Sequence, residues 1–176
     1  FSAGTGQVTS VEALARWHHP TRGPIRPDVF ISVAEESGLI EELGDRLLLQ
    51  ACSDACSWPD HIKVAVNLSP LQFQTDGLCE RVSRVLEATG LPAKRLQLEV
   101  TEGLVIRDVE RTFVELERLR ALGIQILMDD FGVGYSSLSY LRRFPFDTLK
   151  IDRSFIADLD VAPHAHAILS TIIDLG

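Results

Sequence analysis

Residues 124–130, Ile-Gln-Ile-Leu-Met-Asp-Asp, form a nearly all-apolar run that ends in two adjacent carboxylates. A short apolar run of this kind is typical of a parallel strand covered on both faces, and we expect a strand from Ile124 to Asp129. The adjacent acids repel each other unless a cation or a base lies between them. The stretch therefore predicts both a buried strand and a charged site at its end.

The segments on either side of this strand support the same fold. An amphipathic helix is expected from Asp108 to Leu122, with Gly123 as its stop. Its apolar face is expected to carry Phe113, Leu116, Leu119 and Leu122. A glycine-bearing loop, Phe131–Ser137, follows the strand, and a short helix follows the loop.

Strand and helix patterns alternate along the rest of the chain. Strands are expected at Val8–Trp17, Ile62–Asn67, Leu96–Thr101 and around Leu149. Helices are expected from Pro27 to Ser37, from Ile40 to Ser57, from Leu78 to Thr89 and from about Pro163. This alternation is the pattern of an α/β fold with a parallel sheet. An open doubly wound sheet is the main alternative, but it concentrates its site at one switch point. Because polar groups end nearly every strand, we favour a TIM-like (β/α)8 barrel.

Oxygen ligands and one lysine lie at or next to the ends of these strands. They are Glu12, Asn67, Glu99, Asp129, Asp130, Asp152 and Lys150. Any one carboxylate is readily explained as a helix N-cap or a surface charge, but chance explains the whole set poorly. In a parallel barrel these groups would meet on one face, where they could hold two divalent metals and an anionic substrate. Lys150 lies between Leu149 and Ile151 and so projects away from them, toward those ligands.

Composition limits the possible functions of the chain. With 176 residues, 45% hydrophobic and 24% charged, it is expected to form one globular domain. A formal net charge of −8 argues against binding duplex nucleic acid. No apolar run reaches the length of about 20 residues that spans a bilayer, and no signal peptide is visible. An odd number of cysteines favours a reducing cytoplasm or a cytoplasmic part of a larger protein.

Several short motifs now match one family in order and spacing. They are Glu12-Ala13-Leu14 with Arg16, Asn67-Leu68-Ser69, Glu99-Val100-Thr101-Glu102, Asp129–Ser137 and Lys150-Ile151-Asp152. The chain resembles, over essentially all of its length, the EAL-domain phosphodiesterases. These enzymes hydrolyse cyclic di-GMP to linear pGpG in bacterial second-messenger signalling.

The resemblance implies a role for each matched residue. It implies primary Mg²⁺ or Mn²⁺ ligands at Glu12, Asn67, Glu99 and Asp129, and second-metal positions at Asp130 and Asp152. Lys150 matches the catalytic lysine, while Arg16 and Leu14 match residues that contact the substrate's phosphate and nucleotide. Glu102 matches a glutamate that anchors the Phe131–Ser137 loop, which in the family couples dimerisation to metal binding.

The chain also departs from the family pattern. The family pattern includes a preceding strand with a substrate-binding glutamine, and later strand–helix units with a further glutamate and glutamine, and residues 1–176 contain no match for them. We therefore expect an incomplete barrel with weak or no activity of its own, flanked by sensor or cyclase domains in a longer protein. Val133 stands where the family usually has Thr or Ala.

Two alternatives to the enzyme remain open: a receptor that binds cyclic di-GMP without cleaving it, and a dimerising regulatory domain. Retention of every matched ligand argues against both. Other features are expected to be structural. We interpret Cys52 and Cys56 as core or boundary residues, His18–Pro24 as a solvated loop, and the acidic pairs Glu35-Glu36 and Glu41-Glu42 as a solvated face.

Overall fold

A computed structural model describes residues 1–101, 103–104, 109–132, 143–144 and 146–153 of the chain. The predicted helix from Pro163 lies outside these residues, as does most of the short helix predicted after the glycine-bearing loop. Five strands form one sheet in the order β1-β4-β5-β6-β7, and every neighbouring pair is parallel. The strands are β1 (Ser10–Ala13), β4 (Lys63–Asn67), β5 (Leu96–Thr101), β6 (Gln125–Phe131) and β7 (Thr148–Ile151).

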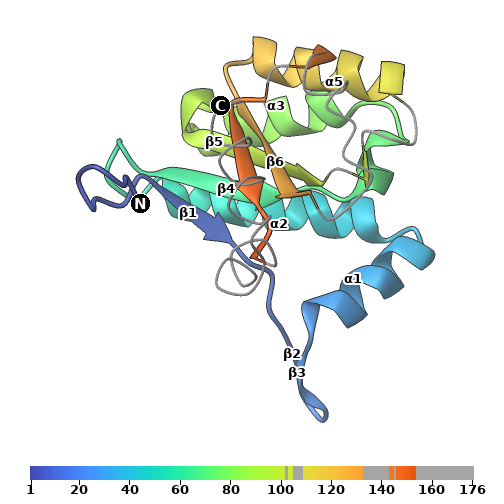
Figure 1. Ribbon diagram of the computed structural model, residues 1–176. Coiled ribbons are helices and arrows are strands. Elements are labelled where there is room, and N and C mark those ends of the chain that lie inside the picture. Colours follow the sequence, from blue (N-terminus) through green and yellow to red (C-terminus); the bar gives the residue numbers. More distant parts are fainter. Residues whose placement is uncertain (102, 105–108, 133–142, 145, 154–176) are drawn as a thin grey trace, which may run out of the picture.

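The predicted α/β class with a parallel sheet is confirmed. The sheet curls as part of a barrel wall, which agrees with a partial (β/α)8 barrel. Three helices, α2 (Ile40–Ala55), α3 (Leu78–Thr89) and α5 (Val109–Ala121), pack side by side over one face of the sheet (Figure 1). Helix α1 (Pro27–Glu36) projects away from this body and reaches it mainly through α2.

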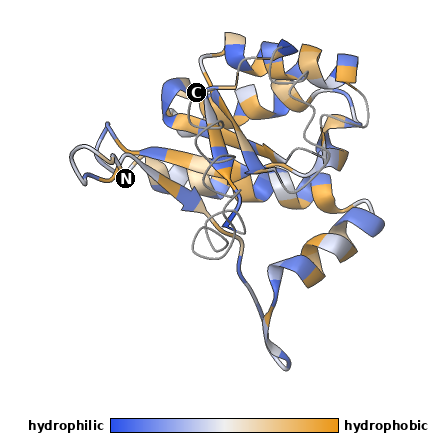
Figure 2. Ribbon diagram, viewed as in Figure 1, coloured by the Kyte–Doolittle hydropathy of each residue, from blue (hydrophilic) through white to orange (hydrophobic). Residues whose placement is uncertain are grey.

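Alternate side chains of the strands build the hydrophobic core beneath the helices. Val64, Val66, Leu98 and Ile126 are at most 5% exposed and pack with Leu116 of α5. Their burial follows from the two-residue period of a strand, which sends every second side chain to the same face. The apolar residues of the strands and of the facing helix sides gather in this layer (Figure 2).

The opposite face of the sheet, here called the inner face, carries polar residues at both strand ends. At the amino end, four neutral or cationic side chains form a hydrogen-bonded network that we call the floor network: Ser10, Lys63, Gln97 and Gln125. The Gln125 Oε1 atom accepts hydrogen bonds from Lys63 Nζ at 2.7 Å and from Gln97 Nε2 at 3.0 Å. Ala65 and Leu127, two positions beyond Lys63 and Gln125 on their strands, are buried apolar residues of the same face.

The segment after β1 differs from its prediction. The expected strand Val8–Trp17 is confined to Ser10–Ala13, and the expected loop at His18–Pro24 is a short antiparallel hairpin of β2 (Trp17–His19) and β3 (Gly23–Ile25). The Trp17 ring packs edge-on against Phe30 of α1, with ring centroids 5.9 Å apart. This contact joins the hairpin to α1, and local sequence does not reveal it.

One other prediction was wrong, and two short elements were not predicted. Leu122 was expected on the apolar face of α5, yet it is exposed, whereas Leu116 and Leu119 are fully buried. Helix α5 ends at Ala121, one residue before Leu122, and at about 100° per residue the nine positions from Phe113 to Leu122 would carry a side chain about half a turn away from the apolar face. Two 3₁₀ helices, η1 (Pro70–Phe73) and η2 (Ala93–Arg95), were not predicted.

The remaining elements follow the predictions closely. Helix α3 and strand β5 have the predicted bounds, and Gly90 ends α3 with a left-handed φ of 72°. The three cysteines are free, with Cys52 and Cys79 buried and Cys56 exposed. Within the described part of the chain, no helix combines the length and the apolar character needed to cross a bilayer.

Candidate functional site

The carboxyl ends of five parallel strands bring the sequence-predicted residues to one edge of the sheet. Asn67 of β4 lies opposite Glu99 of β5 in the strand register, and Glu12, Asp129 and Lys150 lie on the same inner face. The Asn67 Nδ2 atom donates a hydrogen bond to Glu12 Oε1 at 2.9 Å. The amide oxygen of Asn67 is thereby left available for a ligand.

Lys150 places its ammonium group among three carboxylates. Its Nζ atom lies 2.7 Å from Glu99 Oε2, 3.2 Å from Asp129 Oδ2 and 3.5 Å from Glu12 Oε2. Partial burial lowers the pKa of Lys150, but the hydrogen bonds and charges of Glu99 and Asp129 outweigh it and raise the pKa above its ordinary value. The lysine therefore stays cationic, and three acids from three strands share its charge.

Glu99 is the buried member of the set. Its side chain is only 2% exposed, and this burial raises the pKa of its carboxyl despite the opposing effect of Lys150. Its backbone carbonyl accepts a hydrogen bond from the Leu68 N–H at 2.9 Å, which joins the end of β4 to β5. A buried carboxylate with neighbours of like charge is costly unless a cation lies beside it.

The donor set suits a hard divalent cation. One carboxylate oxygen from each of Glu12, Glu99 and Asp129 lies within 4.8 Å of the others. Carboxylate and amide oxygens are the ligands that Mg²⁺ and Mn²⁺ prefer. The Lys150 ammonium lies among these oxygens, which shows that they can surround a positive charge. The residues present thus fit a metal, with Asn67 as a neutral fourth donor.

Asp130 adopts an unusual backbone conformation beside this cluster. Its φ is 53°, the left-handed region, and it is the one described non-glycine residue with positive φ. Its N–H donates to Asp129 Oδ1 at 3.0 Å, and the pairing of β6 with β7 is irregular between Met128 and Phe131. Burial, Asp129 and Asp152 together raise the pKa of the Asp130 carboxyl.

The other predicted site residues lie on the segment after β1, just beyond β7, or outside the described part of the chain. Leu14 and Arg16 are exposed on the segment between β1 and the hairpin, and Arg16 Nη1 donates to the Ala15 carbonyl at 2.9 Å. Asp152 follows β7, and its N–H donates to the Phe131 carbonyl. Glu102 and Val133 lie outside the described residues, as does most of the Phe131–Ser137 loop.

Residues that sequence reasoning missed support the end of β4. Ser69 and Gln72 form a capping box around η1, and the pattern Ser-Pro-Leu-Gln could have revealed it. Glu35 was predicted to be part of a solvated face, but its Oε1 accepts a hydrogen bond from Ser69 Oγ at 2.6 Å. That prediction was wrong for Glu35, because the fold brings α1 against the loop after β4.

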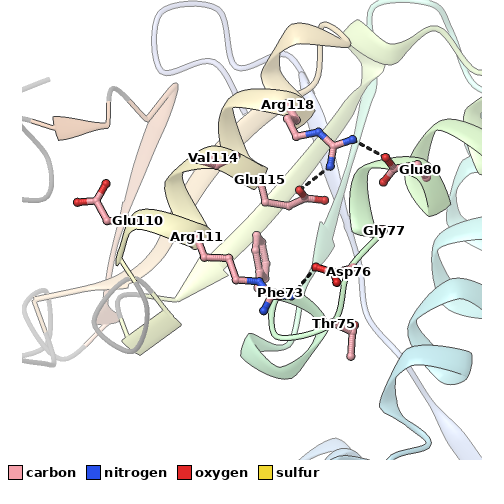
Figure 3. Close-up of a pocket in the computed structure, with 10 residues that line it drawn as sticks. All are labelled: Phe73, Thr75, Asp76, Gly77, Glu80, Glu110, Arg111, Val114, Glu115 and Arg118. Carbon is pink, nitrogen blue, oxygen red and sulfur yellow. Dashed lines mark hydrogen bonds and ion pairs between the residues drawn. The ribbon is translucent and has the colours of Figure 1, made fainter.

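A groove of about 700 Å³ lies elsewhere, between α5 and the segment from η1 to α3 (Figure 3). Most of its charged side chains pair with one another: Arg111 lies 2.9 Å from Asp76, and Arg118 pairs with both Glu80 and Glu115. None of the predicted site residues lines it. The residues predicted to form the site therefore lie at the strand ends rather than in this groove.

Comparison with known proteins identifies relatives of the whole chain. The family model described as "EAL domain" matches residues 1–176. Protein y4lL of Sinorhizobium fredii, which is uncharacterised, is 53% identical over 98% of this chain and 21% of its own length. The cyclic di-GMP phosphodiesterase NbdA of Pseudomonas aeruginosa is 45% identical over 97% of this chain and 22% of its own length.

A solved structure described as the PaMucR phosphodiesterase in complex with c-di-GMP has the same fold. It is 45% identical, with a TM-score of 0.91 over 97% of this chain and 71% of that one. The chain thus spans about a fifth of the length of these two curated relatives and about seven tenths of this structure.

Proposed function

The chain belongs to the EAL domain family, and from this membership we propose that it takes part in hydrolysing one phosphodiester bond of cyclic di-GMP. The product is linear pGpG, and the reaction requires Mg²⁺ or Mn²⁺. The observation that carries the proposal is the meeting of Glu12, Glu99 and Asp129 around a single positive charge. The relatives named above support the choice of substrate.

In this proposal the inner-face residues hold the metals. Glu12, Asn67, Glu99 and Asp129 hold the first ion, and Asp130 and Asp152 hold a second. Bound divalent ions would polarise the phosphodiester and lower the pKa of an attacking water. The left-handed φ of Asp130 interrupts the regular strand conformation next to Asp129, and in this scheme the two adjacent acids serve different ions.

Lys150 and the segment after β1 act on the substrate in this scheme. Lys150 contributes a fixed positive charge next to the reacting phosphate, which offsets negative charge as it develops in the transition state. The Arg16 guanidinium presents a planar fork of donors suited to a phosphate. Leu14, which is 54% exposed, offers an apolar surface for a guanine base.

We place this activity in the cytoplasm, where three free cysteines are stable. We further propose that the domain dimerises through the region of residues 131–137, with Glu102 anchoring that loop. Sensor or cyclase domains in the same protein would supply the regulatory input.

Chromatographic detection of pGpG after incubation of the whole protein with cyclic di-GMP and Mn²⁺ tests this proposal. Glu12→Ala and Lys150→Ala should each abolish product formation. Ser53→Ala, on the exposed side of α2, should leave the rate unchanged. Absence of pGpG with every metal would overturn the enzymatic proposal, and tight nucleotide binding without turnover would instead indicate a receptor.

A further inference from the structure

The loop that follows Asn67 is held by a buried amide. Gln72 is 3% exposed, and its Oε1 accepts a hydrogen bond from the Ser69 N–H at 3.0 Å. In return, the Ser69 carbonyl accepts from the Gln72 N–H at 3.0 Å, and the Ser69 hydroxyl accepts from the Leu71 N–H at 3.2 Å. These bonds fix the backbone two residues beyond a candidate metal ligand.

Helix α2 has a glycine where this amide lies. A Cβ atom on Gly44 would come within 2.3 Å of Gln72 Nε2 and 2.9 Å of its Cδ, closer than real Cβ contacts. Glycine inside a helix is less stable than alanine. A side chain at position 44 could be accommodated only if the buried amide moved, and we expect that movement to disturb the hydrogen bond from the Ser69 N–H to Gln72 Oε1. The close approach of Gln72 therefore gives a structural reason for a glycine at position 44, although glycine makes the helix less stable.

The same loop connects directly to the metal candidates. The Leu68 N–H donates to the Glu99 carbonyl at 2.9 Å, and Asn67 Nδ2 donates to Glu12 Oε1. Leu68 lies between Asn67 and Ser69 in the chain. A shift of the Ser69 backbone would therefore move Leu68, which is bonded to Glu99, and Asn67, which is bonded to Glu12. Ser69 Oγ also donates to Glu35 Oε1 at 2.6 Å, so α1 is attached at the same point.

We propose that Gln72, packed against Gly44, is a positioning residue that aims the Asn67 side chain at the divalent cation. This inference rests on the proposed function, because it presupposes that Asn67 is a metal ligand. Gln72 lies in the layer outside the ligands and acts through the backbone of residues 67–69. Partners of that kind commonly change metal affinity by about 10- to 100-fold when they are lost.

Mn²⁺ binding to the whole protein, followed by electron paramagnetic resonance without nucleotide, tests the proposal independently of turnover. Gly44→Ala and Gln72→Met should each weaken Mn²⁺ binding by about tenfold or more. Gln72→Glu, which keeps an acceptor for the Ser69 N–H, should retain affinity within about threefold of the wild type. The Gly44→Ala and Gln72→Met changes combined should weaken binding no more than Gln72→Met alone, because both act through one hydrogen bond.

The outcomes separate this inference from the proposed function. If the wild-type protein binds no Mn²⁺, the metal proposal itself fails. If it binds Mn²⁺ and Gly44→Ala binds equally well, or if the double variant shows additive losses, the positioning role is overturned. Ser53→Ala on the same helix is the matched control and should bind as the wild type does. Thermal unfolding of each variant shows whether a weakened site belongs to a folded protein.

Discussion

The two ends of the inner face provide partners for their polar side chains in different ways. At the amino end, the floor network joins a hydroxyl and two amides, with one lysine donating to an amide oxygen. At the carboxyl end, two residues further along β1 and β5 and four further along β6, three carboxylates face one lysine. Amides carry both donors and acceptors, so the floor network satisfies itself. Carboxylates only accept hydrogen bonds, so the cluster of Glu12, Glu99 and Asp129 needs cations.

This difference shows that a polar inner face is not by itself a site. Both layers are hydrogen-bonded and partly buried, and both draw on several strands. Only the carboxylate layer has an excess of negative charge, three acids against one base among its described members. An excess of that kind marks the place where the fold holds charge for binding or chemistry instead of for its own stability.

The sharpest contrast pairs two positions of β5 that lie on the same face. Glu99→Gln should weaken Mn²⁺ binding more than about 100-fold, because losing a direct ligand costs more than losing a supporting one. Gln97→Met, one layer below, should leave the affinity within about twofold. Isothermal titration of each variant with Mn²⁺ measures both. Similar losses of Mn²⁺ affinity in the two variants would mean that the two layers do not differ in their contribution to metal binding.

Lys150→Met should destabilise the metal-free protein by about 1–3 kcal/mol, a range discounted for the partial exposure of the lysine, because three acids then lose their cation. Mn²⁺ should return most of that stability, since a cation that binds only the folded state stabilises it. Urea unfolding with and without Mn²⁺ gives both values. Unchanged stability without metal would mean that Lys150 does not neutralise the cluster.

Gln125→Leu should affect stability alone. The change leaves Lys63 and Gln97 without their shared acceptor, and we expect a loss of about 1–2 kcal/mol because the lysine can still reach water. Mn²⁺ affinity should not change. Urea unfolding and Mn²⁺ titration of the same preparation test the two halves of this prediction. A tenfold drop in Mn²⁺ affinity would show that the floor network supports the site above it.

Lowering the pH should affect the carboxylate cluster, where it should weaken Mn²⁺ binding, and should leave the floor network unaffected. Burial raises the pKa of Glu99 above its ordinary value of 4.5, so protons compete with metal from a higher pH than for an exposed carboxylate. As pH falls through the raised pKa, Mn²⁺ affinity should drop by at most about tenfold per unit for this one proton. The same raised pKa makes the metal-free fold lose stability as pH rises through that window.

Mn²⁺ titrations from pH 8 to pH 4.5 at constant ionic strength measure the effect on affinity. An affinity that stays constant down to pH 4.5 would exclude Glu99 as a ligand.

Much of the fold could be predicted because it depends on local periodicity. Helix α3 and strand β5 have unambiguous apolar patterns and clear stops, such as Gly90. The hairpin of β2 and β3 could not be predicted, since its order depends partly on Trp17 meeting Phe30 from a different element. Leu122 was misplaced because a three-residue spacing drifts around the helix.

Some features of the candidate site could likewise be predicted from the sequence, and others could not. Strand-end position was enough to predict that Glu12, Glu99 and Asp129 would meet. Their roles as metal ligands stay predictions. The fit between Gly44 and Gln72 joins positions of two elements that no spacing rule connects, and the left-handed φ of Asp130 leaves no trace in a pattern of apolar residues.

The irregular pairing of β6 with β7 has a consequence for how this domain can vary. Between their matched positions β6 has three steps, from Met128 to Phe131, and β7 has two, from Leu149 to Ile151. The surplus residue lets both adjacent aspartates stand opposite a single lysine. Deleting it would put the two strands back in step and turn one acid away. Over evolution, the length of this strand should therefore be as strictly fixed as the identity of its acids.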